Sequence, residues 1–120
     1  MNISYYLGKT WSPEYDCWSL VREFYDREKG VKLPLVMIDP ENIRNVLREF
    51  AGTEIKQLFK KTTTPKTGDI VEMGYHQKPS HCGIYLDFDG DVRILHNHYT
   101  GGVAAEPKPP HDILNFYTLD

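Results

Sequence analysis

The sequence has little of the features that define several common protein classes. Its 120 residues include only two cysteines, too few for the disulfide framework of a small secreted domain. No apolar run approaches the roughly 20 residues that a membrane helix needs. Residues 1–11 also lack the charged and apolar regions of a signal peptide. We therefore expect a protein made in the cytoplasm, with no membrane span and no structural disulfide.

A large excess of positive charge is also missing. The 14 basic and 17 acidic residues give a formal net charge of −3. Domains that bind nucleic acid usually carry a basic patch or are strongly basic overall, so we expect no nucleic-acid partner. The hydrophobic content of 40% is enough for the core of one ordinary domain, which we assign to residues 1–120.

A cysteine stands in the first turn of the first predicted helix. Asp16 is a good N-cap residue, and Gly30 is typical of a helix end. The apolar residues between them follow the spacing of one buried helical face; they are Cys17, Leu20, Val21 and Phe24. The unpaired N–H groups and the positive dipole end of a helix start favour a thiolate. Cys17 is therefore a candidate nucleophile, although free cysteine is also a common core residue.

Histidines follow on a predicted antiparallel hairpin. We predict strands over residues 70–73, 81–86 and 92–98, a loop over 74–80, and a tight turn at Asp89-Gly90. His81 then lies at the same end of the hairpin as His96 and His98, where the rings can be cross-strand neighbours. Strand alternation places His81 and Cys82 on opposite faces. The pattern predicts a cysteine nucleophile, a histidine base and a second histidine that orients it, with Cys82 in the core.

The rest of the chain is predicted to be scaffold. A second helix is expected from Asp39 to Gly52, and strands are expected over 54–59 and 113–119. The prolines at 107, 109 and 110 predict an extended segment before the last strand. The loop over 74–80 precedes the candidate base and is a candidate border of a ligand cleft.

Four short segments, taken in order, resemble the NlpC-type cell-wall cysteine peptidases. They are Asp16-Cys17, Pro65-Lys66-Thr67-Gly68-Asp69-Ile70-Val71, Ser80-His81-Cys82-Gly83-Ile84-Tyr85-Leu86 and Ile94-Leu95-His96. The resemblance implies a papain-like α+β domain, in which N-terminal helices pack on an antiparallel sheet. It also implies that Cys17 is the nucleophile, His81 the base, and His96 the residue that orients the base.

The same resemblance implies an endopeptidase that cuts peptidoglycan stem peptides, at a bond between D-glutamate and a diaminoacid. Asp16 matches an aspartate that holds a free stem-peptide amine, and Trp11 replaces a tyrosine near the oxyanion site. Trp18 replaces a serine that shares the amine, so its bulk is expected to reshape that pocket and to favour intact cross-linked wall as the substrate. His98 is a further candidate for the lining of the cleft.

Two further segments resemble one branch of the family, found in tail assembly and tail-tip proteins of long-tailed bacteriophages. They are Cys17-Trp18-x-Leu20-Val21-Arg22 and Gly30-Val31-x-Leu33-Pro34. This resemblance implies other tail-tip proteins as partners. It also implies synthesis in the host cytoplasm and a final place in the virion tail, acting at the bacterial cell wall. Neither a metal nor an organic cofactor is required.

Three alternatives stay open at this point. Cys17, His81, His96 and His98 are acceptable zinc ligands, but the close ligand pairs of structural zinc sites are missing apart from His96-x-His98. Amidase or acyltransferase chemistry uses the same thiolate and base. A structural tail-assembly protein with an intact but secondary site is the third alternative, because fold and motif do not separate these functions.

Overall fold

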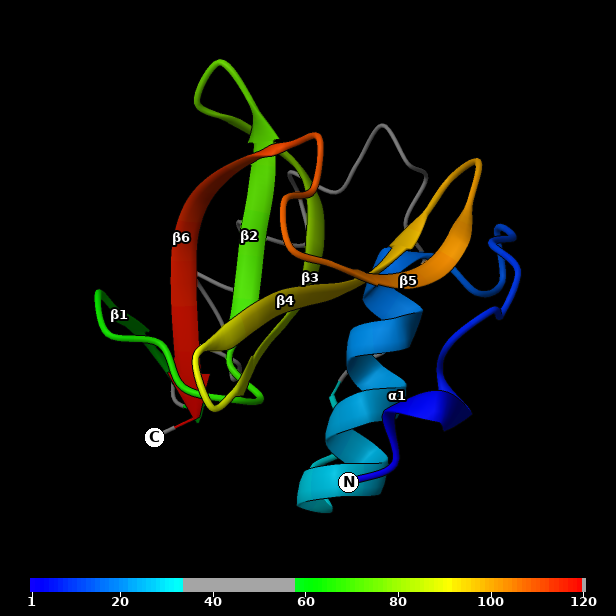
Figure 1. Ribbon diagram of the computed structural model, residues 1–120, viewed down its shortest axis with the longest axis horizontal. Coiled ribbons are helices and arrows are strands. Elements are labelled where there is room, and N and C mark those ends of the chain that lie inside the picture. Colours follow the sequence, from blue (N-terminus) through cyan, green and yellow to red (C-terminus); the bar gives the residue numbers. More distant parts are fainter. Residues whose placement is uncertain (34–57, 120) are drawn as a thin grey trace.

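The computed structural model describes residues 1–33 and 58–119 (Figure 1). A 3-10 turn, η1 (Ile3–Tyr5), and the helix α1 (Cys17–Lys29) come first. The strands of this described part are β1 (Phe59–Thr62), β2 (Ile70–Tyr75), β3 (Lys78–Phe88), β4 (Asp91–His98), β5 (Gly102–Glu106) and β6 (Asp112–Leu119). The helix predicted from Asp39 to Gly52 lies outside the described residues, as does most of the strand predicted over 54–59.

The strands form one antiparallel sheet in the order β1-β6-β2-β3-β4-β5. α1 packs on one face of this sheet, where it contacts β3 and β4 (Figure 1). The described part is thus an α+β arrangement, as predicted. Within residues 1–33 and 58–119, no helix is long and apolar enough to cross a membrane.

α1 forms where the sequence pattern predicts it. Its N-cap is Asp16, and it ends at Gly30, whose φ of 65° is in the left-handed region that glycine adopts without strain. Leu20, Val21 and Phe24 are buried, and they pack with side chains from the facing side of the sheet. A smaller apolar cluster on the other side of the sheet contains Val71, Met73 and Ile94. The sheet is therefore covered by apolar contacts on both faces.

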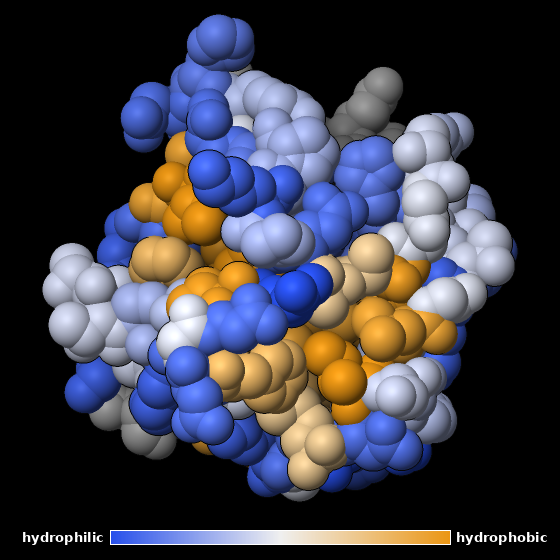
Figure 2. Space-filling view, viewed as in Figure 1, coloured by the Kyte–Doolittle hydropathy of each residue, from blue (hydrophilic) through white to orange (hydrophobic). Residues whose placement is uncertain are grey.

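The connection between β2 and β3 is shorter than predicted. The loop expected over 74–80 is wrong, because β2 continues to Tyr75 and β3 already begins at Lys78. Only His76 and Gln77 make the turn, with φ values of 52° and 67°. Both residues are exposed, and Figure 2 shows hydrophilic side chains on this turn at the top of the molecule.

The edge strand β5 was not predicted. It pairs with β4 and also receives the N-terminal segment, since Val103 N donates to Lys9 O and Gly8 N donates to Val103 O. At Gly102, φ is 71°, and a Cβ atom would lie 2.4 Å from Lys9 O. Glycine at this position allows the segment before α1 to lie against the sheet edge.

Candidate active site

The start of α1 is held by two sets of hydrogen bonds. The Asp16 carboxylate accepts from the Ser19 backbone N–H at 2.9 Å and from the Ser19 hydroxyl at 3.0 Å. From the sheet, the Asn97 amide donates to Tyr15 O at 2.7 Å and to Asp16 O at 3.4 Å. Cys17, in the first turn, is 7% exposed. The candidate nucleophile is thus fixed at a helix N-terminus against β4.

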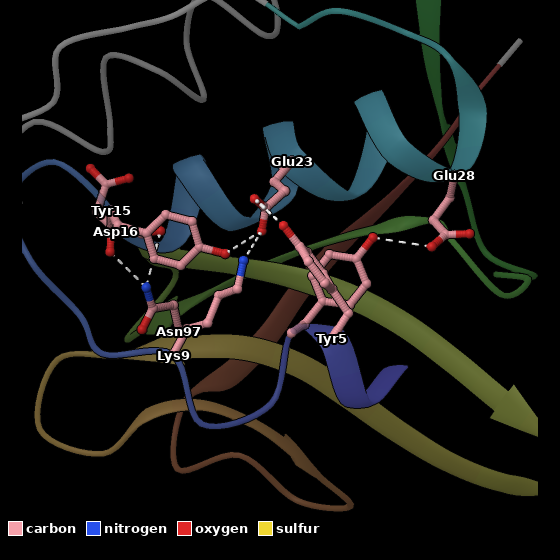
Figure 3. A network of polar contacts seen from close by, with 8 residues as sticks. Tyr5, Lys9, Tyr15, Asp16, Glu23, Glu28 and Asn97 are labelled. Atoms are coloured by element: carbon pink, nitrogen blue, oxygen red, sulfur yellow. Dashed lines mark hydrogen bonds and ion pairs between the residues drawn. The ribbon is translucent and has the colours of Figure 1, made fainter. Parts of the chain in front are cut away.

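A second network holds the residues just before the cysteine (Figure 3). Glu23 of α1 accepts hydrogen bonds from Lys9 and from the Tyr15 hydroxyl, both at 2.8 Å, and a longer one from Tyr5 at 3.3 Å. Tyr15 is therefore attached to α1 through its side chain and to β4 through its carbonyl. This double attachment limits how far the Asp16-Cys17 segment can move.

The two cysteines lie next to each other. Cys82 of β3 is 1% exposed and belongs to the same core cluster as Cys17. Contact with the Cys17 thiol, followed by burial, raises the pKa of the Cys82 thiol well above its usual value. Both cysteines are free. Cys82 is thus a core residue, as predicted, and it also forms part of the surroundings of Cys17.

His81 and His96 form a direct pair. Nε2 of His81 lies 2.8 Å from Nδ1 of His96. The strand register places Gly83 opposite His96, and a Cβ atom at Gly83 would lie 3.1 Å from the His96 Cβ. The side chain of His96 is completely buried, and His81 is 7% exposed. The glycine of the His81-Cys82-Gly83 segment therefore leaves room for the second histidine.

The histidine pair and the nucleophile are not joined by a hydrogen bond in the structure. The described residues contain no such bond between Cys17 and His81, and Nδ1 of His81 has none within them either. Cys82, which contacts Cys17, directly follows His81 in β3. Because neighbouring residues of a strand face opposite sides of the sheet, the described contacts of Cys17 are with Cys82, whereas those of His81 are with the other histidines.

Two further histidines surround the pair. His98 approaches His81 with a ring separation of 6.4 Å, and its Nδ1 meets the Thr100 hydroxyl at 2.9 Å. His111, just before β6, stacks on His81 at 4.4 Å with an interplanar angle of 19°. Sequence reasoning missed His111. It reaches His81 only because β6 pairs with β2, and no local pattern reveals that pairing.

Burial keeps the central histidines neutral. Burial, followed by the neighbouring His111, His96 and His98, lowers the pKa of His81 to about 2. Burial also lowers the pKa of His96, against the opposing effect of the Glu106 carboxylate. The pKa of His111 is lowered by burial and by His96 and His98. A neutral imidazole has a lone pair that can accept a proton, but the lowered pKa of His81 opposes its protonation in this state.

The cluster does not have the geometry of a metal centre. Among the described residues, no group of three or more His, Cys, Asp or Glu side chains is arranged to hold an ion. The zinc alternative combined Cys17 with His81, His96 and His98, but the cysteine lies against Cys82 whereas the three histidine rings contact one another.

The predicted substrate-contacting residues have different surroundings. Trp11 is partly exposed and packs on Tyr99 at 4.7 Å, next to the end of β4. Trp18 is only 1% exposed and lies in the main core, so its bulk cannot reshape a substrate pocket. The hydroxyl that donates a hydrogen bond to the Asp16 carboxylate belongs to Ser19, not to a residue at position 18. The expectation for Trp18 is thus corrected, because position 18 faces inward from α1.

A pocket of about 320 Å³ lies along another part of α1. It is lined by Glu14, Tyr15, Ser19, Arg22, Glu23, Asp26, Lys32 and Leu33. These residues include neither the candidate nucleophile nor any histidine. The pocket is therefore lined by residues other than the candidate nucleophile and the histidine cluster.

Comparison with known proteins gives a match over most of the chain. A family model described as the NlpC/P60 family matches residues 3–111. The matched range contains the start of α1, the paired histidines and His111. No curated protein matches the chain.

Proposed function

The chain belongs to the NlpC/P60 family, and from this premise we propose that it is a cysteine endopeptidase that cleaves peptidoglycan stem peptides. Members of this family are typically cysteine peptidases, and the family points to the cell wall as the substrate. One observation carries the proposal for this chain. A buried histidine pair, joined at 2.8 Å, lies on the two strands β3 and β4 that pack on α1, and Asn97 of β4 is hydrogen-bonded to the residues just before Cys17 in the first turn of that helix.

The proposed mechanism uses Cys17, His81 and His96. Nδ1 of His81 accepts the thiol proton of Cys17, and the thiolate attacks the carbonyl carbon of the scissile amide. Backbone N–H groups at the start of α1, including that of Cys17, stabilise the oxyanion. The protonated His81 then gives its proton to the leaving amine, which leaves a thioester on Cys17. Water, deprotonated by His81, hydrolyses this thioester and restores the free thiol.

The hydrogen bond between nucleophile and base forms in the substrate complex in this proposal. Catalytic hydrogen bonds are often long or poorly aligned without substrate and tighten when it binds. Proton transfer also shifts the equilibrium between the neutral and the protonated ring of His81, because a thiolate beside the ring favours the protonated form. The neutral resting ring described above is therefore compatible with its role as the proton acceptor.

The finer assignments extend the proposal beyond the family. We take the fold as papain-like and residues 1–120 as one domain. The scissile bond is the one between D-glutamate and the diaminoacid, and the protein acts as part of a phage tail tip, with other tail-tip proteins as partners. It is made in the host cytoplasm and reaches the cell wall with the virion. The tail-tip assignments rest on the sequence segments that begin at Cys17 and Gly30, whereas the fold and the scissile bond rest on the four segments that resemble the family and the single domain on length and composition.

The test is the digestion of purified peptidoglycan, followed by mass spectrometry of the released fragments. The parent protein should release fragments that end at the D-glutamyl residue. Cys17→Ala should release none while keeping a parent-like circular dichroism spectrum. Cys82→Ala is the matched control, since it removes the neighbouring thiol and leaves the nucleophile. Equal release by Cys17→Ala and the parent would refute the peptidase proposal, and fragments joined to a new amine would identify acyl transfer instead.

A further inference from the structure

The far nitrogen of His96 faces a carboxylate. Oε1 of Glu106 lies 3.5 Å from Nε2 of His96. Glu106 stands in β5 opposite Ile94, so it lies on the same side of the sheet as His96 and diagonally across from it. The His96 side chain is fully buried, whereas that of Glu106 is 37% exposed.

This nitrogen has no alternative partner in the described part of the chain. Nε2 of His96 is buried and makes no hydrogen bond with the described residues, and Oε1 of Glu106 lies 3.5 Å from it. A lone pair at Nε2 would lie 3.5 Å from the negative carboxylate, whereas an N–H group at the same place would bring a partial positive charge near it. The carboxylate therefore favours the tautomer of His96 that carries its proton on Nε2.

The tautomer of His96 decides the tautomer of His81. With the proton on Nε2, Nδ1 of His96 is an acceptor, and the 2.8 Å contact must be donated by Nε2–H of His81. Nδ1 of His81 then carries the lone pair that a general base needs. The opposite tautomer of His96 would reverse the hydrogen bond, put the proton of His81 on Nδ1, and block the acceptance of a thiol proton.

We propose that Glu106 is a positioning residue that acts through His96 to keep Nδ1 of His81 unprotonated and ready to accept the proton of Cys17. This assignment rests on the proposed function for its catalytic consequence. When His81 becomes an imidazolium, the same carboxylate stabilises the positive charge through His96. Glu106 contacts no reacting atom, so it is not itself a catalytic residue.

The kinetic test is Glu106→Gln, which keeps the size of the side chain and removes its charge. An amide can donate or accept, so it no longer selects one tautomer of His96. We expect kcat to fall by about tenfold or more, in the direction of the ~10⁴-fold loss caused by an amide in place of the orienting carboxylate of a catalytic triad. KM should stay near the parent value, because Glu106 does not touch the substrate. Asp112→Asn is the matched control, since it removes an exposed carboxylate next to His111 and should leave kcat unchanged.

A spectroscopic readout separates this assignment from the proposed function. Protonated and unprotonated imidazole nitrogens have well-separated ¹⁵N shifts, so NMR of the whole protein reports the tautomers without any substrate. The parent and Asp112→Asn should carry the proton on Nε2 of both His81 and His96, and Glu106→Gln should show mixed or reversed tautomers. A proton on Nδ1 of His96 in the parent, or unchanged tautomers in Glu106→Gln, would overturn the assignment. The expected tautomers in a protein that cleaves no peptidoglycan would uphold the role of Glu106 and refute the peptidase proposal alone.

Discussion

The Asn97 side chain joins the two halves of the candidate active site, because it donates a 2.7 Å hydrogen bond from β4 to the carbonyl oxygen of Tyr15 (Figure 3). Its neighbour His96, on the other face of the same strand, holds His81. One strand therefore fixes both the start of α1 and the histidine pair. The Asp16-Cys17 segment cannot shift relative to the histidines without breaking the bond to Asn97.

Asn97→Ala should weaken both stability and catalysis. It removes the 2.7 Å hydrogen bond to the Tyr15 carbonyl, which still accepts from the Ser12 backbone N–H at 3.2 Å, and the loss of one such bond costs about 0.5–1.5 kcal/mol. The helix start should also become less well positioned, so kcat should fall more than KM rises. Urea unfolding and steady-state kinetics measure the two effects. If the free energy of unfolding falls by the expected amount while kcat stays unchanged, Asn97 only supports the fold.

The two cysteines should differ in reactivity. Cys17 lies in the first turn of α1 and is 7% exposed, whereas Cys82 is 1% exposed, and contact with Cys17 and burial keep Cys82 protonated. Iodoacetamide should therefore modify Cys17 in the folded protein and leave Cys82 unmodified, as peptide mass mapping can show. Cys82→Ala should cost roughly 1–2 kcal/mol of unfolding free energy and keep activity, because it removes a small buried side chain. Preferential labelling of Cys82 would contradict the assignment of the nucleophile.

His96 and His98 should rank differently on replacement. His96 is fully buried and bonded to His81, whereas the Nδ1 of His98 is bonded to Thr100. His96→Ala should therefore lower kcat by tens-fold or more, as expected when the residue that orients a base is lost. His98→Ala should have a much smaller effect. The reverse ranking would move the orienting role two residues along β4.

Local sequence patterns were sufficient to predict the helix ends and the hairpin turn, which depend on neighbouring residues. The N-cap at Asp16 and the left-handed end at Gly30 depend on a few neighbouring residues, and both were predicted. The turn at Asp89-Gly90 was also predicted, and its two positive φ values, 54° and 92°, explain the preference for these residues. From this turn the register followed, and with it the closeness of His81 and His96.

The features that depend on tertiary contacts were missed. β5 has no strong alternating pattern, and it is formed by pairing with β4 and with the N-terminal segment. Trp18 looked like a cleft residue from its place beside Cys17, but the helix turns it into the core. His111 and Glu106 join the histidine pair through strand pairings far apart in the sequence. A single sequence gives no direct signal for such pairings.

Acid should destabilise the protein through its buried histidines. Their pKa values are lowered in the folded state, to about 2 for His81. As the pH falls, the unfolded chain therefore binds protons that the folded chain does not bind. The contribution of these histidines to the free energy of unfolding is fully present above pH 6.5, which is about the pKa of a histidine in the unfolded chain. This contribution is lost as the pH falls below that value. Each histidine that stays neutral adds about 1.4 kcal/mol per pH unit to the slope. Urea unfolding between pH 7 and pH 5 measures this slope.

A matched pair of variants assigns the slope to the cluster. His111→Phe keeps an aromatic ring against His81 but removes one group whose pKa is lowered by burial, so the loss of stability with acid should be shallower. His76→Asn removes an exposed histidine from the β2–β3 turn, and asparagine tolerates the positive φ of 52° there. This variant should keep the parent slope. An equal slope in His111→Phe and the parent would exclude His111 from the effect.

The last prediction concerns Asp16, which is either a helix cap or a receptor for the free amine of a stem peptide. One of its oxygens, Oδ1, already accepts from both the backbone and the hydroxyl of Ser19. Trp18 offers the cleft neither a hydroxyl nor bulk, since it is buried. Asp16→Ala should therefore cost about 0.5–2 kcal/mol through the lost cap, whereas Asp16→Asn keeps a capping oxygen and should cost less.

The substrate comparison separates the two roles of Asp16. If the carboxylate only caps α1, Asp16→Asn should cleave intact sacculi and the soluble free-amine tripeptide in the same ratio as the parent, and the parent should favour the sacculi. An ammonium bound by a carboxylate gains a charge-assisted hydrogen bond, which the neutral amide of Asn weakens. A parent that strongly prefers the tripeptide, together with a selective loss of that preference in Asp16→Asn, would therefore identify Asp16 as the amine receptor. Such a result would overturn the assignment of intact, cross-linked wall as the substrate, because an amine receptor at the helix start selects fragments with a free end.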